Sequence, residues 1–131
     1  MAGELILIVE DNEKNRKLER DVLQFHGFRT MEAESAEDGI RLARESVPAL
    51  VLMDIQLPGM NGIQALGHLR ADPLTHGVPI IAVTASAMTQ DRQKIMAAGF
   101  DGYQSKPINV KEFVAVVRQM LDRPAGAERR A

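Results

Sequence analysis

The chain alternates between short apolar runs and longer stretches in which apolar residues recur every three or four positions. Three of the runs are rich in aliphatic and β-branched residues and have the length of a strand. Residues 28–33 indicate a weaker strand, and residues 102–105 a short one. Strands are therefore predicted at residues 5–9, 28–33, 49–53, 79–83 and 102–105. Because continuous apolar runs are typical of strands buried on both faces, the pattern predicts an α/β fold with a parallel sheet between two layers of helices.

Each predicted strand is followed by a segment with helical periodicity. Ser35, Asn61 and Asn109 precede three of these segments as N-cap residues, and Gly27 and Gly99 follow the other two as helix stops. Helices are predicted at about residues 13–26, 35–46, 61–72, 88–98 and 110–121. The apolar residues expected to face the sheet are Leu18, Val22 and Phe25 in the first helix, Ile40, Leu42 and Ala43 in the second, Ile63, Leu66 and Leu69 in the third, and Phe113, Val114, Val117 and Leu121 in the last.

The length and composition of the chain are those of one globular domain. It has 131 residues, of which 45% are hydrophobic and 26% are charged. We expect the domain to span residues 4–121. Residues 122–131 are rich in Pro, Gly, Ala and charged residues and are expected to form a flexible tail.

Charge and cysteine content exclude several classes of protein. The net charge of −2 disfavours general attraction to nucleic acid or to anionic membranes. The absence of cysteine excludes disulfides, thiol catalysis and cysteine-ligated zinc. Neither a signal peptide nor an apolar run of membrane-spanning length is found. We therefore expect a cytoplasmic protein that binds neither nucleic acid nor membranes.

Polar residues that can bind a ligand or take part in a reaction lie where the predicted strands end. Glu10 and Asp11 follow the first strand, Asp54 the third, Thr84 the fourth and Lys106 the fifth. In an open α/β sheet the carboxyl ends of the strands lie at one edge, where ligands bind. We expect these five side chains to share a pocket at that edge.

The chemistry of this set points to a metal ion and a phosphoryl group. Three neighbouring carboxylates repel one another unless a cation lies between them. Oxygen ligands without nearby His or Cys favour Mg²⁺. Together with the Lys106 ammonium and the Thr84 hydroxyl, such an ion can stabilise phosphoryl oxygens. Asp54 can then act as a carboxylate nucleophile that forms an aspartyl phosphate.

The order of these residues resembles the receiver domain of two-component response regulators, over residues 5–121. The stretches 9–12, 52–58 and 105–107 are similar to single-domain regulators of the DivK type and to the receiver modules of hybrid histidine kinases. The resemblance implies a CheY-like (βα)5 fold. This is a doubly wound, five-stranded parallel sheet in strand order 2-1-3-4-5 with helices on both faces.

The resemblance also assigns the roles in phosphoryl transfer. Asp54 would accept a phosphoryl group from the phosphohistidine of a histidine kinase or histidine phosphotransferase. Glu10, Asp11, Asp54 and the main-chain carbonyl of Gln56 would hold Mg²⁺. Lys106 would pair with the carboxylates or with the phosphoryl group. The protein would catalyse only its own phosphotransfer and dephosphorylation, and would not be an enzyme acting on a foreign substrate.

The same resemblance implies a conformational switch. Thr84 would move toward the phosphoryl group and Tyr103 would turn inward in response. The surface formed by the fourth helix, fifth strand and fifth helix would then control a downstream protein partner, with the regulator a monomer or weak dimer. The Lys106–Pro107 bond would be cis.

Other interpretations of single residues remain open. Glu10 and Asp11 can serve only to stabilise the amino end of the first helix through its dipole. Lys106 can be a solvated surface charge. Tyr103 can have a half-buried structural role. The basic cluster of Arg16, Lys17 and Arg20 is interpreted as a solvated helix face. The other possibility is that it steers a donor protein with an acidic surface.

Three other functions compete with the regulator. A haloacid-dehalogenase-type phosphatase also uses an Asp nucleophile, but it needs a second Asp where this chain has Gln56, and room for a cap domain. A flavodoxin-like flavin carrier needs a phosphate-binding loop after the first strand, where Glu10 and Asp11 would repel the phosphate. The third alternative is an interaction scaffold that works without phosphate.

Overall fold

The computed structural model describes residues 3–85 and 89–122, and within this part strands and helices alternate. The strands are β1 (Leu5–Val9), β2 (Arg29–Ala33), β3 (Leu50–Asp54), β4 (Ile80–Thr84) and β5 (Gly102–Ser105). The helices are α1 (Glu13–Phe25), α2 (Ala36–Ser46), α3 (Gly62–Ala71), α4 (Thr89–Ala97) and α5 (Val110–Asp122). The strands pair in parallel in the order β2-β1-β3-β4-β5, which confirms the predicted fold class.

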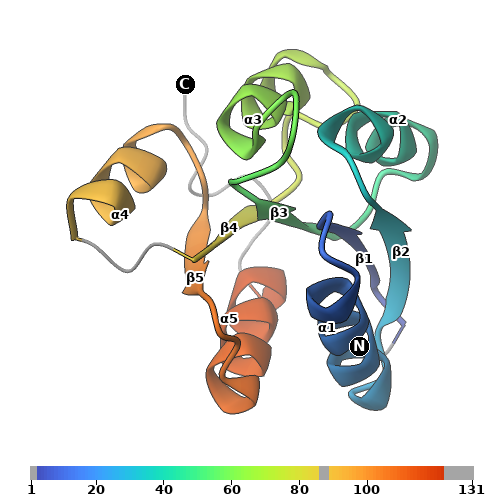
Figure 1. Cartoon of the computed structure of the whole chain (residues 1–131). Coiled ribbons are helices and arrows are strands. Elements are labelled where there is room, and N and C mark those ends of the chain that lie inside the picture. Colours follow the sequence, from blue (N-terminus) through green and yellow to red (C-terminus); the bar gives the residue numbers. More distant parts are fainter. Residues whose placement is uncertain (1–2, 86–88, 123–131) are drawn as a thin grey trace.

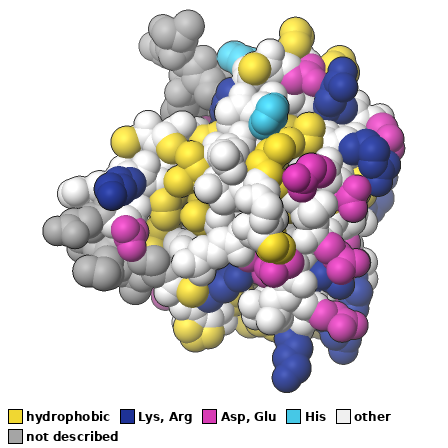
Figure 2. All heavy atoms as spheres, turned by 45° about the horizontal axis from the view of Figure 1, so that its top comes forward, with side chains coloured by type: hydrophobic (Ala, Val, Ile, Leu, Met, Phe, Trp, Pro, Cys, Tyr) yellow, Lys and Arg dark blue, Asp and Glu magenta, His cyan; other side chains and the backbone are white. Residues whose placement is uncertain are grey.

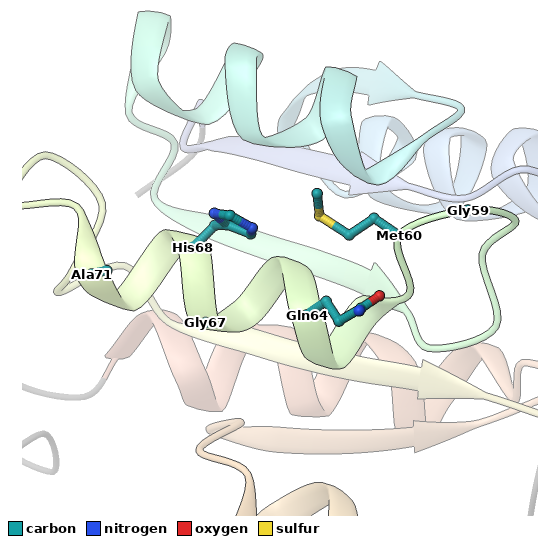
Figure 3. Close-up of a pocket in the computed structure, with 6 residues that line it drawn as sticks. All are labelled: Gly59, Met60, Gln64, Gly67, His68 and Ala71. Atoms are coloured by element: carbon teal, nitrogen blue, oxygen red, sulfur yellow. The ribbon is translucent and has the colours of Figure 1, made fainter.

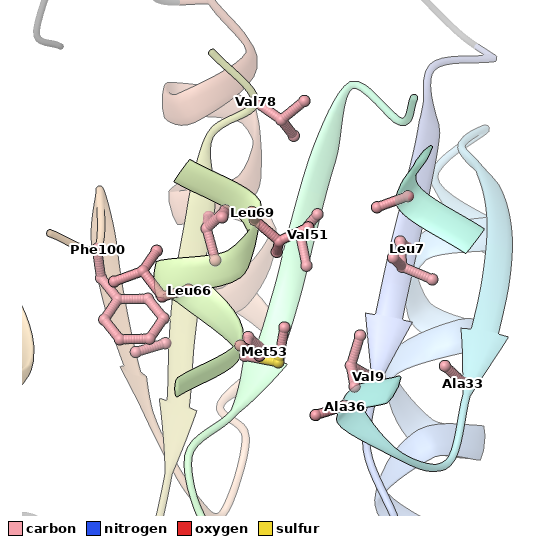
Figure 4. Close-up of a cluster of buried hydrophobic side chains, with 14 of the residues drawn as sticks. Leu7, Val9, Ala33, Ala36, Val51, Met53, Leu66, Leu69, Val78 and Phe100 are labelled. Atoms are coloured by element: carbon pink, nitrogen blue, oxygen red, sulfur yellow. The ribbon is translucent and has the colours of Figure 1, made fainter. Parts of the chain in front are cut away.

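The helices form two layers, one on each face of the sheet (Figure 1). Helices α1 and α5 cover one face, and α2, α3 and α4 cover the other. Each face has its own hydrophobic cluster because successive strand residues point to opposite sides. Leu7, Val9, Val51 and Met53 pack with α2 and α3 (Figure 4). Their sequence neighbours on β1 and β3 pack with Leu23 of α1 and with α5 instead.

Strands β3 and β4 extend one residue beyond their predicted ends, so that Asp54 and Thr84 are the last residues of these strands. Two other predicted boundaries fall outside the described residues. They are the start of the fourth helix at Met88 and the predicted tail, apart from its first residue Asp122, which ends α5.

The prediction for the buried face of α1 was wrong for two of its three residues, since only Val22 packs against the core. Leu18 is 39% exposed and Phe25 is 86% exposed, while Glu19 and Leu23 are buried against the sheet. The stripe through residues 19 and 23 lies about 100° around the helix from the more apolar one. In this rotation Leu23 joins the core beneath α1, and Arg16 and Arg20 pair with Glu32 of β2.

The other helices follow the prediction more closely. Leu66 and Leu69 of α3 are buried, but Ile63 is 40% exposed. On α2, Ala43 is buried while Ile40 and Leu42 are half-buried at the rim of the core. On α5, the predicted residues Phe113, Val114 and Val117 are buried and Leu121 packs against them. None of the helices in the described part of the chain combines the length and apolar character needed to cross a lipid bilayer.

Candidate functional site

The carboxyl edge of the sheet brings three acidic side chains together. Glu10 follows β1 directly, Asp11 begins the loop to α1, and Asp54 ends the neighbouring strand β3. One carboxylate oxygen from each of the three lies within 4.8 Å of the other two. Glu10 is 1% exposed and Asp54 is 3% exposed, whereas Asp11 reaches solvent. This is the acidic cluster that the strand ends predicted.

Lys106 supplies the positive charge of the site. Its Nζ lies 2.7 Å from Oε1 of Glu10 and 3.2 Å from Oδ2 of Asp54. Lys106 follows β5, and its backbone N–H donates to the carbonyl of Thr84 at the end of β4. The bond to Pro107 is cis, as the resemblance implied.

Burial and charge shift the protonation equilibria of the site. Burial raises the pKa of Glu10 to about 7, and the neighbouring Asp54 carboxylate adds to this effect. The ammonium of Lys106 and the N–H of Asn12 oppose that rise. Burial works against the charge of Lys106, but the Glu10 and Asp54 carboxylates outweigh it and raise the pKa of Lys106. The ammonium therefore stays charged at neutral pH.

The donor set fits a hard divalent cation. Three carboxylate oxygens gather at one point, with no His among the groups close enough to join them in the described residues. Few protein oxygens with room for water are what Mg²⁺ requires. The main chain of Gln56 continues directly from Asp54 at the same edge, and its N–H donates to Oδ1 of Asp54 over 3.0 Å.

Comparison with known proteins identifies the family. The model of the response regulator receiver domain matches residues 6–118. The chain belongs to this family. Receiver domains are regulators of two-component systems and not enzymes that turn over a foreign substrate, so the phosphatase and flavin-carrier alternatives are not supported.

Several relatives cover nearly all of the chain. The polar-differentiation response regulator DivK of Brucella ovis is 42% identical over 116 residues, which cover 88% of this chain and 94% of that protein. The receiver domain of the sensor histidine kinase PA1611 from Pseudomonas aeruginosa is 32% identical, with a TM-score of 0.86 over 93% of this chain and 100% of that one. Its crystal structure has a magnesium ion coordinated in the active-site cleft. A putative response regulator from Chloroflexus aurantiacus is 28% identical, with a TM-score of 0.88 over 92% of this chain and 99% of that one.

The predicted switch residues of this receiver domain lie on neighbouring strands. Thr84 is buried at the end of β4, on the same edge of the sheet as Asp54. Tyr103 is half-buried on β5, paired with Ala82 of β4. The guanidinium carbon of Arg92, from α4, lies 5.3 Å from the centre of the Tyr103 ring. This cation–π contact joins the fifth strand to the fourth helix.

Two residues that support the site were missed by sequence reasoning. Gly62 begins α3, and a Cβ there would collide with the carbonyl oxygen of Asp54 and with Ile55. A glycine directly after the N-cap Asn61 was the available signal. Arg16 was interpreted as part of a solvated face, but its side chain is only 13% exposed. No local pattern distinguishes it from its exposed neighbour Lys17.

A groove of about 620 Å³ is lined by residues of α3 and of the loop before it. The side chains of Met60 and His68 lie between α3 and α2 (Figure 3). The groove is lined by Gly59, Met60, Gln64, Gly67, His68 and Ala71.

Acidic and basic side chains are interspersed on the face seen in Figure 2, together with hydrophobic ones. That face therefore shows no continuous basic patch.

Proposed function

We propose that this receiver domain accepts a phosphoryl group on Asp54 from the phosphohistidine of a histidine kinase or histidine phosphotransferase. The observation that carries the proposal is the placement of the Asp54 carboxylate. It is buried at the carboxyl edge of the sheet, clustered with two further carboxylates and 3.2 Å from an ammonium. Like charges held together, two of them buried, are typical of a site that serves a ligand.

In the proposed transfer, a carboxylate oxygen of Asp54 attacks the phosphorus atom. The bond between phosphorus and the donor imidazole breaks, and the electron pair returns to the imidazole nitrogen. Asp54 needs no proton acceptor because it reacts as a carboxylate. The Lys106 ammonium, already 3.2 Å from Asp54, pairs with the new phosphoryl oxygens.

Glu10, Asp11, Asp54 and the main-chain carbonyl of Gln56 would hold Mg²⁺. When bound, the ion supplies positive charge that offsets the carboxylates and the phosphoryl oxygens. The cluster of oxygen ligands in this chain and the magnesium ion in the PA1611 receiver structure support this assignment.

The proposed output is a change on the surface of α4, β5 and α5. The hydroxyl of Thr84 would move to the phosphoryl group, and the space it leaves would let Tyr103 turn inward. Tyr103 contacts Arg92, so its movement would change the surface next to α4. A downstream protein would bind that surface. The proposal keeps the expected domain at residues 4–121, a cytoplasmic location and a monomer or weak dimer.

The first test is the mass of the intact protein after incubation with a small acyl phosphate, with and without Mg²⁺. The wild type is expected to gain one phosphoryl group only when Mg²⁺ is present. Asp54→Asn removes the nucleophile and is expected to gain none. Asp38→Asn, at an exposed position on α2, is the matched control and should behave like the wild type.

A phosphorylated histidine phosphotransferase domain serves as a second donor. Transfer from this donor alone would still support the proposal, because it shows that Asp54 reacts with its protein substrate. A mass gain that persists in Asp54→Asn would contradict the assignment of the acceptor. No gain from either donor would favour the phosphate-independent scaffold.

A further inference from the structure

The side chain of Arg16 folds back from α1 over the loop that carries Glu10 and Asp11. Its Nη1 donates to the main-chain carbonyl of Glu10 over 3.0 Å. Its Nε donates to Oε1 of Glu32 on β2 over 3.2 Å. The guanidinium therefore joins the end of β1 to the neighbouring strand, and 87% of the side chain is withdrawn from solvent, since 13% is exposed.

Asp11 depends on its backbone for its direction. In the part of the chain that the structure describes, its carboxylate makes no hydrogen bond and no ion pair, although it lies close to the carboxylates of Glu10 and Asp54. Two peptide groups flank Asp11. The carbonyl of the first is bound by Arg16, and the N–H of the second, from Asn12, donates to Oε2 of Glu10 over 3.1 Å.

We propose that Arg16 is a positioning residue for the divalent-cation site. By binding the Glu10 carbonyl, it fixes the peptide plane before Asp11 and so directs the Asp11 carboxylate toward Asp54. Glu32 holds the guanidinium in place. This inference rests on the proposed Mg²⁺ site and adds a residue that does not touch the ion.

Arg20 provides a matched comparison on the same helix. Its Nη1 lies 3.4 Å from the other oxygen of Glu32, and its Nε donates to Asp21 over 3.2 Å. Within residues 3–85 and 89–122 it forms no hydrogen bond with the loop of Glu10 and Asp11. Removal of Arg20 therefore breaks an ion pair to β2 and leaves the loop carbonyl bound.

The test is a calorimetric titration of the full chain with Mg²⁺. Arg16→Met is expected to weaken binding by about 10- to 100-fold, as is typical for loss of a group that orients a ligand. Arg16→Lys keeps a cation that can reach only one of the two acceptors, so its affinity should fall between those of wild type and Arg16→Met. Arg20→Met should bind Mg²⁺ like the wild type.

Combination with Asp11→Asn separates positioning from general destabilisation. If Arg16 acts through Asp11, the double variant should bind Mg²⁺ no more weakly than Asp11→Asn alone. Thermal unfolding without Mg²⁺ accompanies each titration. If Arg16→Met does not fold, Arg16→Lys carries the test, in the single and double variants.

Each outcome bears on a defined assignment. Three outcomes would overturn only the positioning role of Arg16 and leave the metal site standing. They are wild-type affinity for Mg²⁺ in the Arg16 variants, equal weakening by Arg20→Met, and additive effects with Asp11→Asn. By contrast, failure of the wild type to bind Mg²⁺, or unchanged binding by Asp11→Asn, would overturn the proposed metal site itself. The two failures are therefore distinguishable in one set of titrations.

Discussion

Single residues without chemistry of their own shape the site. Gly62, the first residue of α3, lies so close to the end of β3 that there is no room for a Cβ atom between them. Its N–H donates to the carbonyl of Ile55 over 3.1 Å, and a Cβ would overlap the carbonyl oxygen of Asp54. The obstacle is backbone, which cannot rotate away as a flexible side chain can.

Gly62→Ala is therefore expected to move the end of β3 and to destabilise the fold by about 2 kcal/mol or more. The shift should also reduce the extent of Mg²⁺-dependent phosphorylation of Asp54 in the protein that remains folded. Gly67→Ala is the control on the same helix, because a Cβ there meets nothing within 4 Å. It should raise the free energy of unfolding by about 0.5–1 kcal/mol. Urea unfolding measures both, and a neutral Gly62→Ala would show that the contact relaxes freely.

At the scale of helices and strands, the rotation of α1 places a carboxyl group inside the protein. Glu19 is 1% exposed, and its Oε2 has no hydrogen-bond partner among the described residues. Burial raises the pKa of Glu19 to about 8, with a further rise from the charges of Glu10 and Asp54 and an opposing effect of Lys106. The folded protein thus binds a proton that the unfolded chain, with a value near 4.5, releases.

The consequence is a stability that falls as pH rises. Between about pH 4.5 and 8 the folded state holds more protons at Glu19 than the unfolded state does, so each step upward in pH favours unfolding. Glu19→Gln should remove this loss of stability. Its free energy of unfolding should exceed that of the wild type by roughly 2–4 kcal/mol at pH 8, with little difference at pH 4.5. Urea unfolding across this range measures it, with Glu34→Gln at an exposed loop position as the control. A constant difference between Glu19→Gln and wild type would contradict the interpretation.

Glu19 also shows why sequence reasoning succeeded for strands and failed for this helix. A strand buried on both faces leaves no choice of face, so the ends of the three apolar runs of β1, β3 and β4 directly located Glu10, Asp54 and Thr84. Lys106 follows the shorter, alternately buried strand β5. A helix has several faces, and α1 offers two possible stripes. The choice between them depends on contacts with β2, the next strand in the chain, and with α5, which lies far along the chain. The rotation of α1, and with it Glu19 and Arg16, follows from tertiary packing and not from periodicity.

At the scale of the whole molecule, the two edges of the sheet carry different groups of charged side chains. The acidic cluster occupies the carboxyl edge. At the amino edge, Arg70 from α3 donates to the carbonyl of Val78 over 2.6 Å and pairs with Asp101 over 2.7 Å. The same Asp101 oxygen accepts the N–H of Ile80, the first residue of β4. One half-buried ion pair therefore joins α3, β4 and the turn before β5.

Asp101→Asn is expected to lower the stability of the fold and to leave the phosphorylation of Asp54 unchanged. The amide still offers an oxygen to the Ile80 N–H, but the half-buried guanidinium of Arg70 loses this counter-charge, which should lower the free energy of unfolding by about 1–3 kcal/mol. Asp38→Asn removes an exposed pair with Arg41 at 3.7 Å and should change stability by less than about 1 kcal/mol. Below the unfolding transition, Asp101→Asn should be phosphorylated on Asp54 to the same extent as the wild type, because the ion pair lies at the opposite edge from the acceptor. A folded Asp101→Asn protein with reduced phosphorylation would instead show that the amino edge of β4 and β5 is coupled to the site through the strands that end at Thr84 and Lys106.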